Sequence, residues 1–316
     1  MIRSRLFVGL LAVLGASLTA CAGEAGDPPE QASEASQAII GGTPAVGDKY
    51  AAVGGLVEAF VDPYYGVLAY STFCSATLVG PQEIVTARHC TKYLDNLSYP
   101  DSGIFFAIGE NAYFPDQYVQ VVGYEAARPG KKKNNGLLRD GGRDVAVMYL
   151  ESEPEGVIPA KIGRFQKHML GQKFELVGFG RNDDFNDGAR YRGVAKARQM
   201  HGLWYSALFD HNPWKYWNWY WTDADTNPSW KEGREWWRTY RLEAGYELLA
   251  GGDDGEALGC YGDSGGPLLR GNNAHSLTVY GVGFATEASK SRVCDNGSAF
   301  LVFHKEEILH FLRHAL

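Results

Sequence analysis

Short apolar runs separated by turn residues fill most of the chain. Residues 73–80 and 83–87 are rich in apolar and β-branched side chains and flank Gly80-Pro81, which predicts two strands joined by a turn. Residues 144–150 form another apolar strand, which begins with an acid. Further short strands are expected at residues 105–109, 118–124 and 298–303.

One helical pattern stands out, at the C-terminus, where apolar side chains recur at helical spacing and predict a helix over residues 305–315. The chain has 39 glycines and few other helical patterns, which favours a loop-rich β protein. Its 316 residues, 45% of them apolar and 21% charged, suffice for one or two globular domains. The net charge of −7 argues against nucleic acid as the main partner.

The first 21 residues have the features of an export signal. Arg3 and Arg5 precede an apolar run over residues 6–18, which is too short to span a membrane comfortably. The small residues before Cys21 resemble the bacterial lipoprotein box, in which that cysteine carries the lipid. An ordinary signal peptide cut near the same place is the alternative. Residues 22–38 have almost nothing to bury, so we expect a flexible pro-segment that serves as a tether.

Four cysteines remain once Cys21 is assigned to the lipid. Cys74, Cys90, Cys260 and Cys294 are an even number in an exported and oxidising setting, which predicts two disulfides. The count alone leaves all three pairings open.

Residues 259–267 carry an acid and a hydroxyl among glycines. Asp263 and Ser264 stand between Gly262 and the pair Gly265-Gly266. Glycine permits backbone conformations that side chains forbid. The N–H groups can therefore turn toward one point, as stabilisation of an oxyanion requires. A glycine-rich turn with an incidental serine is the alternative.

This segment, Gly-Cys-Tyr-Gly-Asp-Ser-Gly-Gly-Pro, resembles the nucleophile loop of the trypsin/chymotrypsin family of serine proteases. The resemblance covers residue 39 to the C-terminus, except an aromatic insertion. It implies an all-β fold of two packed six-stranded antiparallel β-barrels, over about residues 39–155 and 156–303, followed by the C-terminal helix. It also implies strands at residues 174–180 and 279–286, the second of which lines the substrate pocket.

The resemblance implies a catalytic triad. The run around His89 is similar to the family's Thr-Ala-Ala-His-Cys, and the run from Asp144 is similar to its Asp-Ile-Ala-Leu-Leu. His89, Asp144 and Ser264 would be base, orienting acid and nucleophile, in the chain order of the chymotrypsin type. The N–H groups of Gly262 and Ser264 would form the oxyanion hole. Arg88, where the family has alanine, departs from the pattern beside the base.

Activation by cleavage is also implied. Residues 39–42, Ile-Ile-Gly-Gly, resemble the family's Ile-Val-Gly-Gly, where cleavage frees an isoleucine ammonium that pairs with the acid before the nucleophile. The pair here would be Ile39 and Asp263. Because Ala38 precedes Ile39, no trypsin-like activator is expected. A strand start with a glycine hinge is the alternative.

The resemblance selects the disulfides Cys74–Cys90 and Cys260–Cys294. It places Leu258 where trypsin-like members have an acid at the pocket floor. An apolar leucine cannot pair with Lys or Arg, so we expect cleavage after an apolar or aromatic side chain.

Four other pocket residues follow from the resemblance. The family's Ser-Trp-Gly corresponds here to Phe284, Ala285 and Thr286, and Tyr261 lies in the nucleophile loop. The missing serine removes a hydrogen bond expected to hold Asp144. A threonine in place of glycine narrows the pocket.

All eight tryptophans lie between Trp204 and Trp237, within the insertion over about residues 200–240. Three interpretations are open: a local aromatic core that packs the insertion onto the barrel, an exposed surface for a peptide or partner, or a platform that stacks on glycans.

The sequence thus predicts a monomeric, exported serine endopeptidase that cleaves protein or peptide substrates without trypsin specificity. We expect no cofactor, no metal and no nucleic acid partner. A lipid on Cys21 would anchor the precursor at the outer membrane or cell surface, and cleavage before Ile39 would release the protease. The alternatives are a catalytically inactive protease-like binding protein that presents the insertion, and a glycan-binding surface protein.

Overall fold

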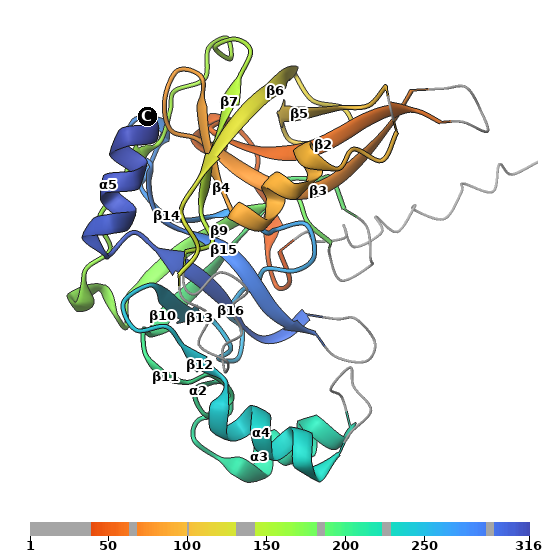
Figure 1. Ribbon diagram of the computed structural model, residues 1–316. Coiled ribbons are helices and arrows are strands. Elements are labelled where there is room, and N and C mark those ends of the chain that lie inside the picture. Colours follow the sequence, from red (N-terminus) through yellow and green to blue (C-terminus); the bar gives the residue numbers. More distant parts are fainter. Residues whose placement is uncertain are drawn as a thin grey trace, which may run out of the picture. The chain divides into compact units, whose positions relative to one another are not determined.

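The structure is a computed structural model that describes residues 39–62, 68–99, 101–130, 143–181, 187–222, 229–288 and 294–316. The expected signal segment with Cys21 and the tether, residues 1–38, lie outside the described residues. In the described part of the chain, no helix is both long enough and apolar enough to cross a membrane. Most of the ordered elements are strands, and each half of the described chain builds its own β structure (Figure 1).

The first half forms a closed barrel of six strands: β2 (Val53–Val61), β3 (Leu68–Leu78), β4 (Glu83–Thr86), β5 (Gly103–Ile108), β6 (Gln117–Ala126) and β7 (Ala146–Leu150). The barrel order is β2-β3-β4-β7-β6-β5, and neighbouring strands are antiparallel. Side chains alternate across a strand. In β6, for example, Val119 and Val121 are buried while Gln120 and Val122 are exposed.

The second half forms a ring of six strands: β9 (Lys173–Gly178), β10 (Tyr191–Gln199), β13 (Glu247–Ala250), β14 (Pro267–Arg270), β15 (Thr278–Ala288) and β16 (Cys294–Val302). β9 pairs with β14 on one side and with β10 on the other, so the antiparallel order β9-β10-β13-β16-β15-β14 closes on itself. The expected fold of two six-stranded barrels is confirmed. Two short strands join this ring from outside: β1 (Thr43–Pro44) on β10 and β8 (Lys161–Ile162), parallel to β15.

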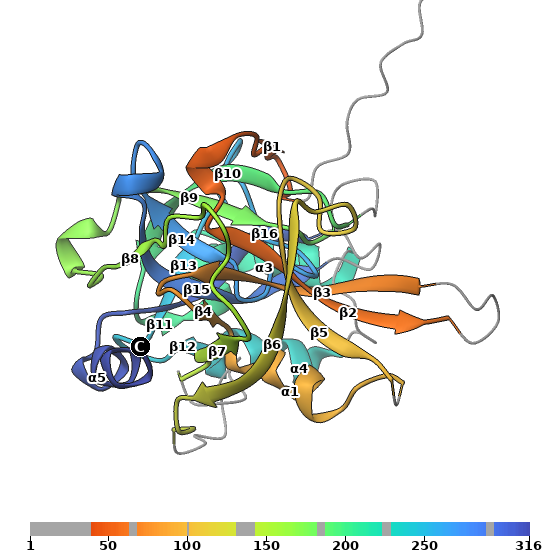
Figure 2. The same cartoon turned by 90° about the horizontal axis from the view of Figure 1, so that it is seen from above.

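The C-terminal helix α5 (Glu306–Ala315) packs against the barrels with one apolar face. Ile308 and Leu312 belong to the same core cluster as Val147 in β7 and Leu301 in β16, so the helix and both barrels contribute to one core. Figure 2 shows α5 and the β2–β3 hairpin at opposite sides of the described chain. The predicted helix is therefore confirmed, with its start one residue later.

Three helices occupy the insertion: α2 (Trp204–Leu208), α3 (Pro213–Thr222) and α4 (Trp230–Thr239). They surround an aromatic cluster that includes the fully buried Trp204, Tyr216 and Tyr220. The cluster packs onto the second barrel through Leu249 of β13 and Ala299 of β16. In Figure 1, α3 and α4 lie beyond the short strands β11 (Gly202–Leu203) and β12 (Arg241–Leu242). A local aromatic core is thus the interpretation that the structure confirms for these residues.

Gly233 in α4 tests how tightly this aromatic cluster is packed. A Cβ atom here would lie 2.6 Å from Cζ3 of Trp217 and 2.7 Å from Cε1 of Tyr220. Alanine in a free helix would be favoured by about 1 kcal/mol, whereas overpacking costs about 1–3 kcal/mol. We expect Gly233→Ala to lower the free energy of unfolding in urea. Arg234→Ala, on the exposed side of the same helix, is the control, and a more stable Gly233→Ala protein would contradict the tight packing.

Candidate active site

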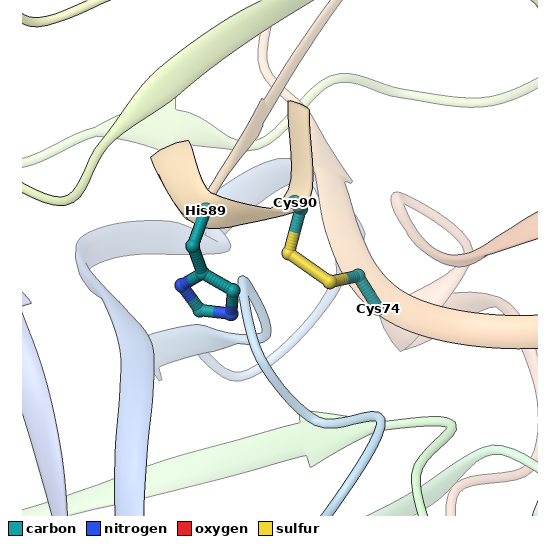
Figure 3. A group of neighbouring side chains, drawn as sticks. All are labelled: Cys74, His89 and Cys90. Atoms are coloured by element: carbon teal, nitrogen blue, oxygen red, sulfur yellow. A yellow bond between two sulfur atoms is a disulfide. The ribbon is translucent and has the colours of Figure 1, made fainter. Parts of the chain in front are cut away.

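His89 lies just after strand β4, in the 3-10 turn η2 (Arg88–Thr91). Its neighbour Cys90 forms a disulfide with Cys74 of β3, which ties the turn to the barrel (Figure 3). The three side chains lie close together, but the sulfur atoms are bonded to each other and offer no thiolate to a metal. The disulfide therefore supports the position of His89.

Strand pairing brings Asp144 to His89. β4 and β7 are antiparallel with Thr86 opposite Ala146, so Asp144, two residues before β7, meets the turn just after β4. Asp144 Oδ2 lies 2.8 Å from His89 Nδ1, and Oδ1 accepts a hydrogen bond of 2.9 Å from the backbone N–H of His89. The two bonds fix both the ring and its backbone. Arg88, the departure from the family pattern, does not prevent this arrangement.

The loop that carries Ser264 is held by the first barrel. Gly262 has φ +93° and Gly265 has φ +82°, a region of the backbone map that favours glycine. Ser75 of β3 donates its backbone N–H to the carbonyl of Ser264 at 2.8 Å and its hydroxyl to the carbonyl of Gly262 at 3.0 Å. The sequence analysis missed Ser75, and its position beside Cys74 was the one signal that could have drawn attention to it.

Asp263 is a buried acid, with 7% of its surface exposed. Its Oδ1 accepts a hydrogen bond from the N–H of Gly180 at 2.9 Å, and its Oδ2 accepts one from the N–H of Cys260 at 2.8 Å. Both donors are neutral amides. Burial raises the pKa of Asp263 to about 8, although the two hydrogen bonds act in the opposite direction. Cys260 is fixed in turn by its disulfide with Cys294, so both disulfides are the pairs that the resemblance implied.

His89, Asp144 and Ser264 line one cavity of about 390 Å³, between the first and the second barrel. Ile39 and Asp263 contribute to the same lining. The cavity wall also includes four of the expected pocket residues: Tyr261, Phe284, Ala285 and Thr286. Residues from distant parts of the sequence therefore meet where a substrate can enter.

Leu258, expected at the pocket floor, does not line this cavity. Its backbone forms a two-way pair with Ile40, each N–H donating to the other's carbonyl at 3.0 Å. This pairing directs the side chain into the interior, where it is 8% exposed and lies near Gly251. Leu258 thus lies outside the lining of this cavity, and its role at a pocket floor stays a prediction.

Residues of β16 form a wall that the sequence analysis missed. Ser298, Ala299 and Phe300 line the cavity, and Ser298 lies opposite Thr286 in the β15–β16 ladder. The Ser298 hydroxyl accepts a hydrogen bond of 2.9 Å from the N–H of Gly259. No local signal marks Ser298, because only the strand register brings it to the pocket.

Residues 56–199 of the chain match the Trypsin family model. A comparison with curated protein sequences finds no match. Among solved structures, the fold is similar to that of neuropsin, a serine protease expressed in the limbic system of mouse brain. The TM-score is 0.55 at 17% sequence identity, and the alignment covers 87% of this chain and 99% of that chain. The family match covers the segment that contains His89 and Asp144, and the chain shares the two-barrel fold of a serine protease, so both comparisons support a serine peptidase of the trypsin/chymotrypsin type.

Proposed function

We propose that the protein hydrolyses peptide bonds through His89, Asp144 and Ser264, with an acyl-enzyme intermediate. The observation that carries the proposal is the His89–Asp144 pair in the cavity that Ser264 also lines. The Ser264 hydroxyl attacks the substrate carbonyl while His89 takes its proton. His89 then returns the proton to the leaving amine, and water hydrolyses the acyl-enzyme by the same route. Asp144 holds the imidazole in one tautomer and stabilises its charged form.

The N–H groups of Gly262 and Ser264 are the proposed oxyanion donors. The peptide groups that carry these donors contain the carbonyls of Tyr261 and Asp263. The Tyr261 carbonyl accepts a hydrogen bond from the N–H of Arg181 at 2.5 Å, and the Asp263 carbonyl accepts one from the N–H of Gly266 at 2.8 Å, which restricts the rotation of both peptide groups. Donors fixed before the reaction stabilise the developing negative charge most effectively, and loss of one such donor lowers the rate by about a hundredfold or more.

Labelling with a fluorophosphonate, which reacts with activated serines, tests the proposed nucleophile. The samples are protein whose N-terminus has been generated at Ile39, uncut precursor, and Ser264→Ala. Labelling of the cut form alone, at Ser264, is the expected result. Labelling of both forms would keep the enzyme and reject the activation step. Folded, cut protein that stays unlabelled would instead favour a protease-like binding protein.

Cleavage before Ile39 is the proposed activation step. Ile39 is 1% exposed and lines the same cavity as Asp263, whose hydrogen-bond donors among the described residues are two neutral backbone amides. A new ammonium group at Ile39 would supply a cation. A buried ion pair of this kind needs both partners, because either charge alone is costly to bury.

Thr286 is proposed to limit the size of the substrate side chain that can enter the pocket. Its hydroxyl donates to the carbonyl of Gly297 at 3.1 Å, which holds the side chain in the cavity wall. Thr286→Gly removes that side chain. For substrates that carry Phe before the cleaved bond, we expect kcat/KM relative to that of substrates with Ala there to rise about tenfold. Peptide amides that differ only at this residue measure it. An unchanged ratio would show that Thr286 does not limit the pocket.

Lipidation of Cys21 is the proposed mode of attachment for the precursor. Family proteases with disulfides are typically secreted, and the two disulfides described here fit an oxidising compartment. Neither disulfide joins the segment before Ile39 to the protease region, so cleavage there would release the enzyme from its lipid. Detection of Ile39-initiated protein in the membrane fraction would contradict this coupling of activation to release.

A further inference from the structure

Glu247, the first residue of β13, is a buried acid that the proposed mechanism does not use. It is 1% exposed, and its backbone pairs with Leu301 of β16. Its Oε2 accepts a hydrogen bond of 2.6 Å from the N–H of Glu243. Its Oε1 is buried and has no hydrogen-bond partner within the described part of the chain. An ionised carboxylate with an unpaired buried oxygen is costly, so this environment favours the protonated acid.

Tyr246, which directly precedes Glu247, is in contact with Arg143, which directly precedes Asp144. Arg143 donates to the Tyr246 hydroxyl at 3.2 Å, and its guanidinium lies 4.8 Å from the centre of that ring. Arg143 and the Tyr246 hydroxyl also bind the same oxygen of Glu307 in α5, each at 2.6 Å. Arg143, Tyr246 and Glu307 thus form one cluster. Asp144 directly follows its member from the first barrel, and Glu247 directly follows Tyr246.

Two neighbouring acids act on Glu247 by their charge. Burial is the main cause that raises the pKa of Glu247 to about 8, and the charges of Glu243 and Asp144 raise it further. The hydrogen bond from Glu243 acts in the opposite direction. Interaction between two sites is reciprocal. A charge that appears on Glu247 must therefore act on Asp144 and on the imidazole that Asp144 holds.

We propose that Glu247 is a positioning residue that acts on His89 through Asp144, by adding a second negative charge when its carboxyl loses a proton. The inference rests on the proposed function of His89 and Asp144. The transition state contains the positively charged imidazolium of His89. A negative Glu247 stabilises that charge, so peptide hydrolysis should become faster as Glu247 ionises.

The pH dependence of kcat/KM for a peptide amide tests this. We expect the cut enzyme to show an extra rise of about fivefold, centred near pH 8, which Glu247→Gln lacks. Glutamine is uncharged at every pH, and its carbonyl can still accept from Glu243. Glu243→Gln is the matched control, and it should keep the rise but move its midpoint to lower pH, because the charge of Glu243 helps to raise the pKa of Glu247. The same profile in the wild type and in Glu247→Gln would overturn the inference.

A second readout does not need activity. In Ser264→Ala protein, the NMR signals of the His89 ring should show an inflection near pH 8 that disappears when Glu247→Gln is added. Glu247→Met, which also lacks the charge, replaces the glutamine variant if that one does not fold. An inflection near pH 8 that survives both substitutions would overturn the role of Glu247. If the inflection depends on Glu247 as expected but the cut wild-type enzyme hydrolyses no peptide, the result counts against the proposed function and not against the role of Glu247.

Discussion

Ser264→Ala is expected to lower kcat by about 10⁶-fold, because it removes the proposed nucleophile. His89→Ala should lower kcat by about as much, and the double variant should be no slower, since the two groups act as one unit. Residual hydrolysis above the uncatalysed rate is expected from the oxyanion donors and substrate binding. Single-turnover kinetics with a peptide ester measure the loss, since the wild type should show a burst of acyl-enzyme that the variant lacks.

The control for this experiment is a serine away from the cavity. Ser152 lies on an exposed loop after β7, and Ser152→Ala should leave kcat within twofold or so of the wild type. Thermal unfolding of all variants shows whether they remain folded. A folded Ser264→Ala protein that keeps the burst would contradict the assignment of the nucleophile.

Asp263→Asn is expected to stabilise the uncut precursor in mild alkali and to destabilise the cut enzyme. In the precursor the pKa of Asp263 is raised to about 8, above the ordinary value for an unfolded aspartate. The folded precursor thus binds a proton that the unfolded chain has lost. This contribution to stability is fully present below the unfolded pKa and is lost as the pH rises through 8. Asparagine does not ionise, so the stability of the variant does not fall for this reason as the pH rises.

The cut enzyme should show the opposite sign. Its new Ile39 ammonium needs the Asp263 carboxylate, and loss of one partner of a buried ion pair costs about 3–5 kcal/mol. Urea unfolding of both forms between pH 5 and pH 9 measures the two effects. Glu247 also makes the stability fall as the pH rises. It is present both in the wild type and in Asp263→Asn, so its effect cancels in the comparison. A variant that destabilises both forms equally would show that Asp263 does not pair with Ile39.

Short local motifs predicted the centre of the site and much of the fold. The residues around His89, Asp144 and Ser264 are contiguous runs that resemble family motifs, and the structure brings the three residues to one cavity. β10 was missed because its buried positions are mostly small: Ala195 and Ala197 face the core between Lys and Arg. When the buried residues of a strand are small, buried and exposed positions differ little in hydrophobicity, so the alternating strand pattern is hard to recognise.

The helices of the insertion were missed for another reason. Closely spaced aromatic residues hid the helical period of α3, although α4 begins with a recognisable start signal. The side chain of Ser229 accepts a hydrogen bond from the N–H of Glu232, as a helix N-cap does. Ser298 and Glu247 had no local signal, because strand register between distant segments determines what they face.

The bonds from Ser75 have a consequence for the order of folding. Ser75 of the first barrel holds two carbonyl groups of a loop that belongs to the second barrel, one through its hydroxyl and one through its backbone N–H. A molecule in which the second barrel alone has folded would contain the complete nucleophile loop without its supporting bonds. Such a half-folded chain would be a poor protease. If the chain is the proposed protease, its self-digestion would be limited until both halves have assembled.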